Sequence, residues 1–358
     1  MNTALNRSWI EINLGALENN VRKIKAALPK GTVYIAVVKA DAYGHSLPRS
    51  VVRFLKGGAD MFAVANMQEV SRIRELVSSK PVLVLSPLLP DERRLVFEYG
   101  ATPAISTLEE ALDFNSLARE RGRILDLHVK IDTGMGRFGV WHEKAVEFLR
   151  EVSKFSNLRI SGVFTHLSSA DCDESYTHMQ MRNFTRVVEE FGAKNILIHL
   201  HASAGLNYIK DGAPFNAVRV GLLQYGISPF GGRCKTIANV EPVMSFKARI
   251  ASISRNEKRI IATVSAGFAD GVPSNFSKNA CVLVSKKCPI LGGVSLDETL
   301  VDIANASEAE QGDEVVFIGK QGGECIDLPL YSHWTRRIPW ETMVAIPRRV
   351  AREVVNVK

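Results

Sequence analysis

The feature that most constrains the fold is a repeated alternation of short apolar segments with amphipathic ones across residues 32–220. The amphipathic segments, such as 67–77, 107–121, 143–152 and 174–191, carry apolar residues at helical spacing. Eight strand–helix units predict a (β/α)8 barrel, whose functional site lies at the carboxyl ends of the strands. The eight apolar segments are 32–38, 61–65, 82–85, 102–105, 124–131, 160–165, 196–200 and 217–220.

A different pattern begins near residue 240, where strand-like segments follow one another without long helical segments between them. This succession predicts a second, mainly β domain, and the alternating segment 8–13 is expected to pair with it. We therefore expect residues 1–13 to pack with the C-terminal domain, residues 14–239 to form the barrel and residues 240–358 to form the β domain. The expected strands of that domain are 244–254, 259–264, 280–284, 289–294, 299–303 and 314–318.

Composition excludes several classes of function. Of the 358 residues, 46% are hydrophobic and 23% are charged, which is typical of a globular protein. The net charge of +7 comes from scattered basic residues rather than from a basic stripe interleaved with aromatic residues, which argues against a nucleic-acid partner. Five cysteines without paired metal-ligand spacing favour a reducing compartment. With neither a signal peptide nor a membrane-spanning apolar run, we expect a cytoplasmic protein with no membrane partner and no bound metal.

Lys39 directly follows the apolar segment 32–38, at the point where a strand would leave the sheet. Burial there would lower the pKa of the lysine, and a neutral amine can act as a base or form a Schiff base. Tyr43 then supplies a phenol that can bind an anion, and Gly44 permits a tight turn. A single lysine at a strand end more commonly reaches into water, so a functional site needs support from the other strand ends.

Other reactive side chains also follow predicted strands. Arg137 lies in a glycine-rich loop that can present its guanidinium to a carboxylate. Arg219 lies within an apolar strand, where an unpaired charge is costly, so we expect it to have a partner. The remaining polar residues along or at the ends of these strands are His128, Lys130, Asp132, His166, His199 and His201.

Two kinds of site are compatible with these residues. His166, His199 and His201 could hold zinc in a metal hydrolase. A pyridoxal phosphate site needs instead a lysine for the aldehyde, backbone amides for the phosphate and a partner for the pyridine nitrogen. The first strand ends in a lysine rather than in metal ligands, which favours pyridoxal phosphate. The groups that would fill these roles are Lys39, the turns at 203–205 and 221–222, and Arg219.

Six segments, in order along the chain, resemble motifs of the alanine racemase family, the fold-type III pyridoxal phosphate enzymes. Residues 37–46 read V-V-K-A-D-A-Y-G-H-S, similar to the family's V-V-K-A-(D or N)-A-Y-G-H-G. Residues 130–139 read K-I-D-T-G-M-G-R-F-G, similar to K-(V, I or L)-D-T-G-M-G-R-L-G. The resemblance covers nearly the whole chain and implies both the barrel and the β domain. The other four similar segments are 164–166, 201–205, 218–226 and 294–299.

The resemblance also implies roles around the cofactor, pyridoxal 5'-phosphate. Lys39 would hold it and then move the α-proton of the amino acid on one face. Arg219 would hydrogen-bond the pyridine nitrogen and keep it unprotonated, and His166 would in turn hydrogen-bond Arg219. The residues implied to hold the phosphate are Tyr43, Ser203, Gly221 and Leu222.

On the substrate side, the resemblance implies that Arg137 steers the carboxylate, and Leu296 stands at a position that faces the substrate. Lys130 is the candidate for carbamylation, which would make it an anionic partner for Arg137. In the family, the β domain of one subunit closes the active site of the other, so the resemblance implies a homodimer. The implied reaction interconverts L-alanine and D-alanine, which supplies D-alanine for peptidoglycan.

The chain departs from the family at the second catalytic base. The family uses a tyrosine in G-Y-(A, G or S)-D-G, and here Phe268 occupies that position and cannot carry a proton. General base catalysis is typically worth about 10²–10⁴-fold in rate, so an impaired alanine racemase is one interpretation. The alternatives are a paralogue with one-base chemistry on another amino acid and a non-catalytic pyridoxal phosphate-binding protein, although Arg137 argues against the latter. Further departures from the family are Ala202, Val272, Gly293, Leu296 and Arg348, the last of these standing near an expected phosphate-binding tyrosine.

Overall fold

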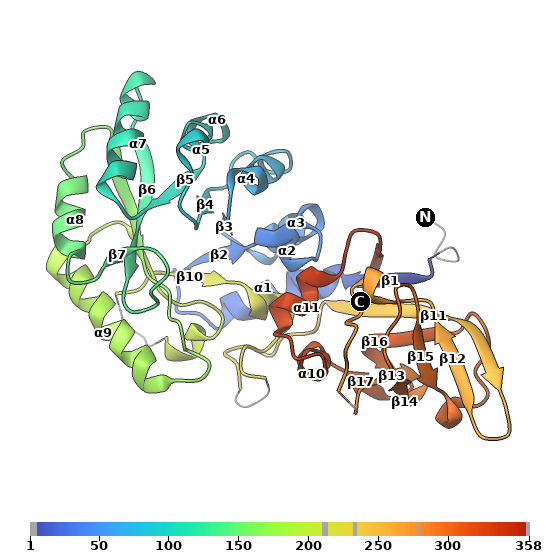
Figure 1. Ribbon diagram of the computed structural model, residues 1–358. Helices are drawn as coiled ribbons and strands as arrows, with labels where there is room; N and C mark the ends of the chain where they lie inside the picture. The colour runs from blue at the N-terminus through green and yellow to red at the C-terminus, as the bar shows by residue number, and fades with distance from the viewer. Residues whose placement is uncertain (1–5, 210–213, 232–234, 278, 356–358) are drawn as a thin grey trace.

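A computed structural model describes residues 6–209, 214–231, 235–277 and 279–355, so the first five residues of the expected N-terminal segment lie outside the described residues. The chain forms a barrel of strands and helices beside a mainly β part (Figure 1). The predicted fold class, a (β/α)8 barrel followed by a mainly β C-terminal region, is confirmed. Among the described residues, no helix is long and apolar enough to cross a membrane.

Parallel strands form the barrel wall in the order β10–β2–β3–β4–β5–β6–β8–β9. A backbone hydrogen bond of 2.9 Å from Arg219 N to His201 O joins the two ends of this order, so the sheet closes on itself. The short strand β7 (Val140–Trp141) adds to β6. The wall strands are β2 (Val33–Val37), β3 (Met61–Val64), β4 (Val82–Val84), β5 (Thr102–Ile105), β6 (Leu125–Asp132), β8 (Leu158–Phe164), β9 (Leu197–His199) and β10 (Ala217–Val220).

Helices cover the outside of these strands (Figure 1), and the longer ones each bury one apolar face. In the first, Leu17, Val21 and Ile24 are buried, and the Asn13 side chain accepts a 3.0 Å hydrogen bond from Ala16 N at the helix start. The helices of this region are α1 (Leu14–Ala26), α2 (Lys39–Tyr43), α3 (Leu47–Gly57), α4 (Met67–Arg74), α5 (Pro90–Arg93), α6 (Leu95–Tyr99), α7 (Leu108–Glu120), α8 (Ala145–Val152) and α9 (Glu174–Phe191).

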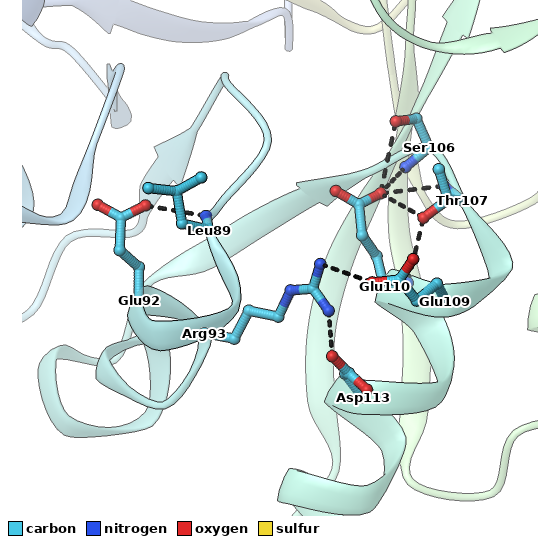
Figure 2. A network of polar contacts seen from close by, with 8 residues as sticks. All are labelled: Leu89, Glu92, Arg93, Ser106, Thr107, Glu109, Glu110 and Asp113. Atoms are coloured by element: carbon cyan, nitrogen blue, oxygen red, sulfur yellow. Dashed lines mark hydrogen bonds and ion pairs between the residues drawn. The ribbon is translucent and has the colours of Figure 1, made fainter.

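A polar network fixes the turn from β5 into α7 (Figure 2). Glu110 accepts backbone hydrogen bonds from Ser106 (2.7 Å) and Thr107 (3.0 Å), and the Thr107 hydroxyl accepts from Glu110 N (3.1 Å). This reciprocal capping starts α7 directly after the strand. The buried Arg93 of α5 forms an ion pair with Asp113 of α7, which ties two neighbouring helices together outside the barrel.

The C-terminal part is built on a second sheet, in the order β17–β16–β13–β14–β15–β12–β11–β1–β18. Because β11 also pairs with β16, six of these strands close into a ring. The N-terminal strand pairs antiparallel with β11 and parallel with β18. The strands are β1 (Ser8–Asn13), β11 (Met244–Arg255), β12 (Ile260–Val264), β13 (Cys281–Val284), β14 (Lys286–Leu291), β15 (Thr299–Asp302), β16 (Glu314–Gln321), β17 (Glu324–Ile326) and β18 (Ala351–Val355).

Two short helices of the C-terminal part, α10 (Leu328–Trp334) and α11 (Pro339–Ala345), lie between the ring and the barrel (Figure 1). Helix α11 packs closely on the segment that follows Lys39, since a Cβ at Gly44 would lie only 2.6 Å from Met343 O. The backbone of Gly44 has φ +78°, so both the close approach and the left-handed conformation favour glycine there. The C-terminal part therefore contacts the barrel beside the predicted reactive lysine.

Candidate active site

A cavity of about 610 Å³ opens at the carboxyl ends of the barrel strands. It brings together the side chains or backbone of nine residues that the sequence predicted for a site. It also contains Asp171 and Trp340, which the sequence interpretation did not select. The nine predicted residues are Lys39, Tyr43, Lys130, Arg137, His166, Ser203, Arg219, Gly221 and Leu222.

The backbone after Lys39 is left-handed for four consecutive non-glycine residues, with φ between 51° and 56° from Ala40 to Tyr43. This conformation costs roughly 1–2 kcal/mol for each such residue, so neighbouring groups must hold it. Glu69 accepts a 2.5 Å hydrogen bond from Ala40 N, and Arg72 forms a 2.8 Å ion pair with Asp41. The turn places the phenol of Tyr43 beside Gly221, where a Cβ would lie 2.9 Å from the Tyr43 oxygen.

Lys39 lies where its amine can be neutral more readily than an exposed lysine. Burial lowers its pKa, the positive charge of Arg137 lowers it further, and the carboxylate of Glu69 opposes both effects. Arg137 also lines the cavity, with its guanidinium over the ring of Phe138 at 5.0 Å. The cavity therefore pairs an available amine with a fixed cation that can bind an anionic group.

Arg219 is buried, and the barrel wall supplies its partners. It donates to Thr165 O at 2.6 Å and to His199 O at 2.9 Å, and it also contacts His199 Nδ1 at 2.7 Å. An arginine only donates, so His199 Nδ1 accepts and its Nε2 carries the proton, which it donates to His128 Nδ1 at 2.9 Å. Burial, reinforced by Arg219, lowers the pKa of His128 to about 3, consistent with neutral rings in this chain of contacts.

The hydrogen bond that we expected between His166 and Arg219 is made by His199 in the described residues. His166 lines the cavity instead, and burial together with the charges of Arg219 and Lys130 lowers its pKa to about 3. Lys130 donates to Phe138 O at 3.2 Å, and burial and Arg219 lower its pKa to about 8. The sequence located His199 at a strand end but did not assign it this role, because an H-x-H pattern does not say which neighbour each ring meets.

One corner of the cavity is rich in hydrogen-bond donors. The Ser203 hydroxyl oxygen accepts from Gly221 N at 3.2 Å and from Leu223 N at 3.1 Å, which leaves its own proton free to donate into the cavity. Tyr43 lies across Gly221 from this turn, and the absence of a side chain at Gly221 keeps the backbone open. This corner fits a phosphate, and the cationic walls fit the rest of an anionic cofactor such as pyridoxal phosphate.

Two predicted residues, Phe268 and Leu296, do not line this cavity. Both are on the C-terminal part and are about half exposed, at 50% and 53%. Their loops are joined, because Phe268 N donates to Ser295 O at 3.0 Å and a Cβ at Gly267 would lie 2.3 Å from Leu296 O. Within one chain, therefore, Phe268 lies outside the cavity that contains Lys39.

The structure places Trp340, rather than Arg348, next to Tyr43 in the cavity. Burial raises the pKa of Tyr43 to about 12, and a side-chain hydrogen bond with Trp340 opposes that rise. The chain has four tryptophans and no sequence spacing distinguishes this one, so only the packing of α11 identifies it. Among the described residues, no group of three or more His, Cys, Asp or Glu side chains is arranged to hold a metal ion.

Comparisons with known proteins cover both parts of the chain. The family model for the alanine racemase N-terminal domain matches residues 12–229, and the model for the C-terminal domain matches residues 243–354. The alanine racemase of Halothermothrix orenii is 35% identical over an alignment of 376 residues, which covers 99% of each chain. The solved alanine racemase of Clostridium difficile 630 in complex with cycloserine is 29% identical, with a TM-score of 0.89 and coverage of 98% of this chain and 96% of that one. The structure from Bacillus anthracis with bound L-Ala-P is 30% identical, with a TM-score of 0.86 and coverage of 98% and 95%.

Proposed function

The chain belongs to the alanine racemase family, and we propose that it uses Lys39 to hold pyridoxal phosphate and to move the α-proton of alanine. Enzymes of this family are pyridoxal phosphate-dependent isomerases, and the full-length likeness to them supports alanine racemase activity. The observation that carries the proposal is a single cavity that contains Lys39, the buried Arg219 and the donor-rich corner at Ser203 and Tyr43.

When it is bound, pyridoxal phosphate makes the α-proton of an attached amino acid acidic by delocalising the electron pair left behind. Lys39 would hold the aldehyde end, and Tyr43, Ser203, Gly221 and Leu222 would hold the phosphate. Arg219 would donate to the ring nitrogen. Arg219 stays protonated near neutral pH, because burial lowers its pKa only to about 9, so it acts as a hydrogen-bond donor and not as a base.

The proton transfer on one face would be carried out by Lys39 Nζ. Its lowered pKa makes the neutral, proton-accepting form more accessible near neutral pH. Arg137 would fix the carboxylate of the amino acid, so that the α-carbon faces the amine. His166 is expected to be neutral and Lys130 largely charged at neutral pH, since their pKa values lie near 3 and 8. Lys130 remains the candidate for carbamylation, which requires a neutral amine that its lowered pKa makes available.

The opposite face lacks the family's phenol, because Phe268 has no ionisable group. We propose that exchange of the α-proton at the face of Lys39 is faster than inversion, by about 10²-fold or more if no other group replaces the missing base. A side chain in the position of Phe268 can still exclude water and pack against the amino acid. The chain is then an alanine racemase of low inversion rate.

We also propose that two copies of the chain share their active sites. Phe268 and Leu296 are large apolar side chains that are half exposed on adjoining loops. Neither lines the cavity that contains Lys39 in the same chain. Ile338, at the rim of the cavity, is 58% exposed. A second copy that inserts the loops of Phe268 and Leu296 into this rim would cover apolar surface on both sides. In the cell, we place the reaction in the cytoplasm, where D-alanine is needed for peptidoglycan.

The proton-transfer proposal is tested with protein loaded with pyridoxal phosphate in D2O. L-alanine and D-alanine are incubated separately, loss of the α-proton is followed by NMR, and inversion is followed by chiral chromatography. One enantiomer should exchange much faster than it inverts, and Lys39→Ala should abolish both processes. Borohydride reduction followed by peptide mapping should place the cofactor on Lys39. Equal rates of exchange and inversion would contradict the role assigned to Phe268, and a label on another lysine would contradict the role of Lys39.

Sharing of sites is tested by mixing two inactive variants. Lys39→Ala lacks the amine, and Leu296→Arg is expected to block the partner's cavity while it leaves the fold intact, because Leu296 is half exposed. A mixed dimer would contain one site with Lys39 from the second variant and Leu296 from the first. Mixing after partial dissociation should therefore restore α-proton exchange. If Leu296→Arg is active by itself, or if the mixture stays inactive, the loops of one chain do not complete the site of the other.

A further inference from the structure

We propose that Phe138 is a positioning residue for Arg137, whose guanidinium it holds ready to bind the carboxylate of the substrate. The inference rests on the proposed role of Arg137 in fixing the amino acid. Both side chains line the cavity, as does Lys130 near the end of strand β6. The sequence interpretation selected Arg137 and Lys130 but assigned no role to the phenylalanine beside them.

The backbone of the loop that follows β6 is fixed on both sides of Arg137. On one side, the buried carboxylate of Asp132 accepts hydrogen bonds of 2.8–2.9 Å from three successive backbone amides. On the other side, Lys130 Nζ donates to Phe138 O at 3.2 Å. The conformational freedom at residue 137 is therefore that of its side chain rather than of its backbone. The three amides belong to Gly134, Met135 and Gly136.

The ring of Phe138 restricts that side chain. Arg137 is exposed, and within the described residues its guanidinium makes neither a hydrogen bond nor an ion pair. The guanidinium carbon lies 5.0 Å from the centre of the Phe138 ring, within the range of a cation–aromatic attraction. An exposed arginine samples many rotamers, and a ligand that binds it must overcome the entropy cost of fixing one of them. The ring contact reduces that cost because it limits the rotamers before the substrate arrives.

The same ring also contacts Lys130. The Lys130 ammonium nitrogen lies 4.9 Å from the ring centre, so two positive charges meet one aromatic side chain. Within the part of the chain that the structure describes, neither cation forms an ion pair with a carboxylate. Lys130 takes part as an ammonium, since carbamylation would replace the cation that the ring attracts with an anion. Lys130 therefore holds Phe138 through both its carbonyl oxygen and its ring.

An aromatic ring can hold a guanidinium without competing for its ligand. A protein carboxylate paired with Arg137 would occupy its N–H donors, and the carboxylate of the substrate would have to displace it. A ring attracts the cation through its quadrupole instead and leaves those donors available. Removing the ring should therefore weaken the binding of carboxylates and leave the binding of neutral analogues unchanged.

The test compares propionate with propionamide, using protein loaded with pyridoxal phosphate and NMR titration of each ligand. Propionate has the carboxylate of alanine but no amine to react with the cofactor, and propionamide is its neutral counterpart. Phe138→Leu removes the ring and keeps an apolar side chain, whereas Phe138→Tyr keeps the ring. Phe97→Leu is the matched control, because the ring of Phe97 also contacts a guanidinium, that of Arg121 at 4.8 Å, but lies outside the cavity.

Phe138→Leu should weaken propionate by about 3- to 10-fold and leave propionamide unchanged. Phe138→Tyr and Phe97→Leu should bind propionate as wild type does. The melting temperatures of Phe138→Leu and Phe97→Leu should be similar, because each variant loses one half-buried ring. In an Arg137→Met background, Phe138→Leu should have no further effect on propionate, because the ring acts through the guanidinium.

Equal weakening of propionate and propionamide by Phe138→Leu would overturn the inference, since it would indicate a role in packing alone. Weaker propionate binding in Phe138→Tyr, or a further loss in the Arg137→Met background, would overturn it as well. If Arg137→Met leaves propionate binding unchanged, the proposed role of Arg137 fails and the inference fails with it. A different result, in which Arg137→Met weakens propionate and Phe138→Leu does not, would refute only the role of Phe138.

Discussion

Phe268→Tyr should convert a chain that exchanges one enantiomer into one that inverts both. The change adds one hydroxyl to a side chain that is 50% exposed. The loop is held by backbone contacts, Phe268 N to Ser295 O at 3.0 Å and Ala269 N to Leu296 O at 2.9 Å, which do not depend on the ring. We therefore expect the free energy of unfolding to change by no more than about 0.5 kcal/mol, as for other surface substitutions.

The expected gain in rate follows from the worth of a positioned acid–base group. A factor of about 10²–10⁴ corresponds to roughly 3–5 kcal/mol off the barrier for the step on the face opposite Lys39. The gain should be selective. The enantiomer whose α-proton lies on the Phe268 side should exchange faster by that factor, whereas the enantiomer already served by Lys39 should change little.

The assay is α-deuterium exchange and inversion in D2O, run from each enantiomer with Phe268→Tyr and with wild type. Phe97→Tyr, which adds a phenol on α6 outside the cavity, is the matched control and should behave as wild type. An unchanged inversion rate in Phe268→Tyr would refute the reasoning, because it would mean that this position never meets the reacting carbon. Acceleration of both enantiomers alike would refute the assignment of Lys39 to one face.

Three further predictions concern stability. Burial and Arg219 lower the pKa of Lys130 from 10.5 to about 8, so between these pH values the unfolded chain binds a proton that the folded chain does not. The free energy of unfolding should therefore rise with pH across that window by about 3 kcal/mol. Denaturant titrations at several pH values should show this rise in wild type and not in Lys130→Met. Gly44→Ala should lower the free energy of unfolding by about 1–3 kcal/mol more than Gly31→Ala. Both glycines have positive φ, but of the two only an added Cβ at Gly44 would meet other atoms within 4 Å. Equal losses in thermal unfolding would contradict the close packing of α11. Asp113→Ala should destabilise the fold by about 1–2 kcal/mol, because it removes a partner of the buried Arg93, and an unchanged melting temperature would show that this ion pair contributes little.

The sequence determined the architecture and the main chemistry of the cavity. Eight alternating units of a buried strand and an amphipathic helix are typical of one closed fold, the (β/α)8 barrel. In that barrel the carboxyl ends of all the strands lie at the same rim. Lys39, Arg137 and Arg219 could therefore be assigned to one site from their places after or within strands. Arg219 lies within its strand, whereas Lys39 and Arg137 follow theirs, so the information that places all three at this rim is local.

The tertiary structure alone decided which distant residues meet at that rim. Trp340 reaches Tyr43 because α11 packs against Gly44, about three hundred positions away along the chain, and no local pattern encodes that contact. In the same way, it is His199 that meets Arg219, because strands β9 and β10 are neighbours where the barrel closes. The separation of Phe268 from the cavity also depends on how the second sheet sits beside the barrel. Periodicity fixes the face on which a side chain lies, but long-range packing fixes what it faces.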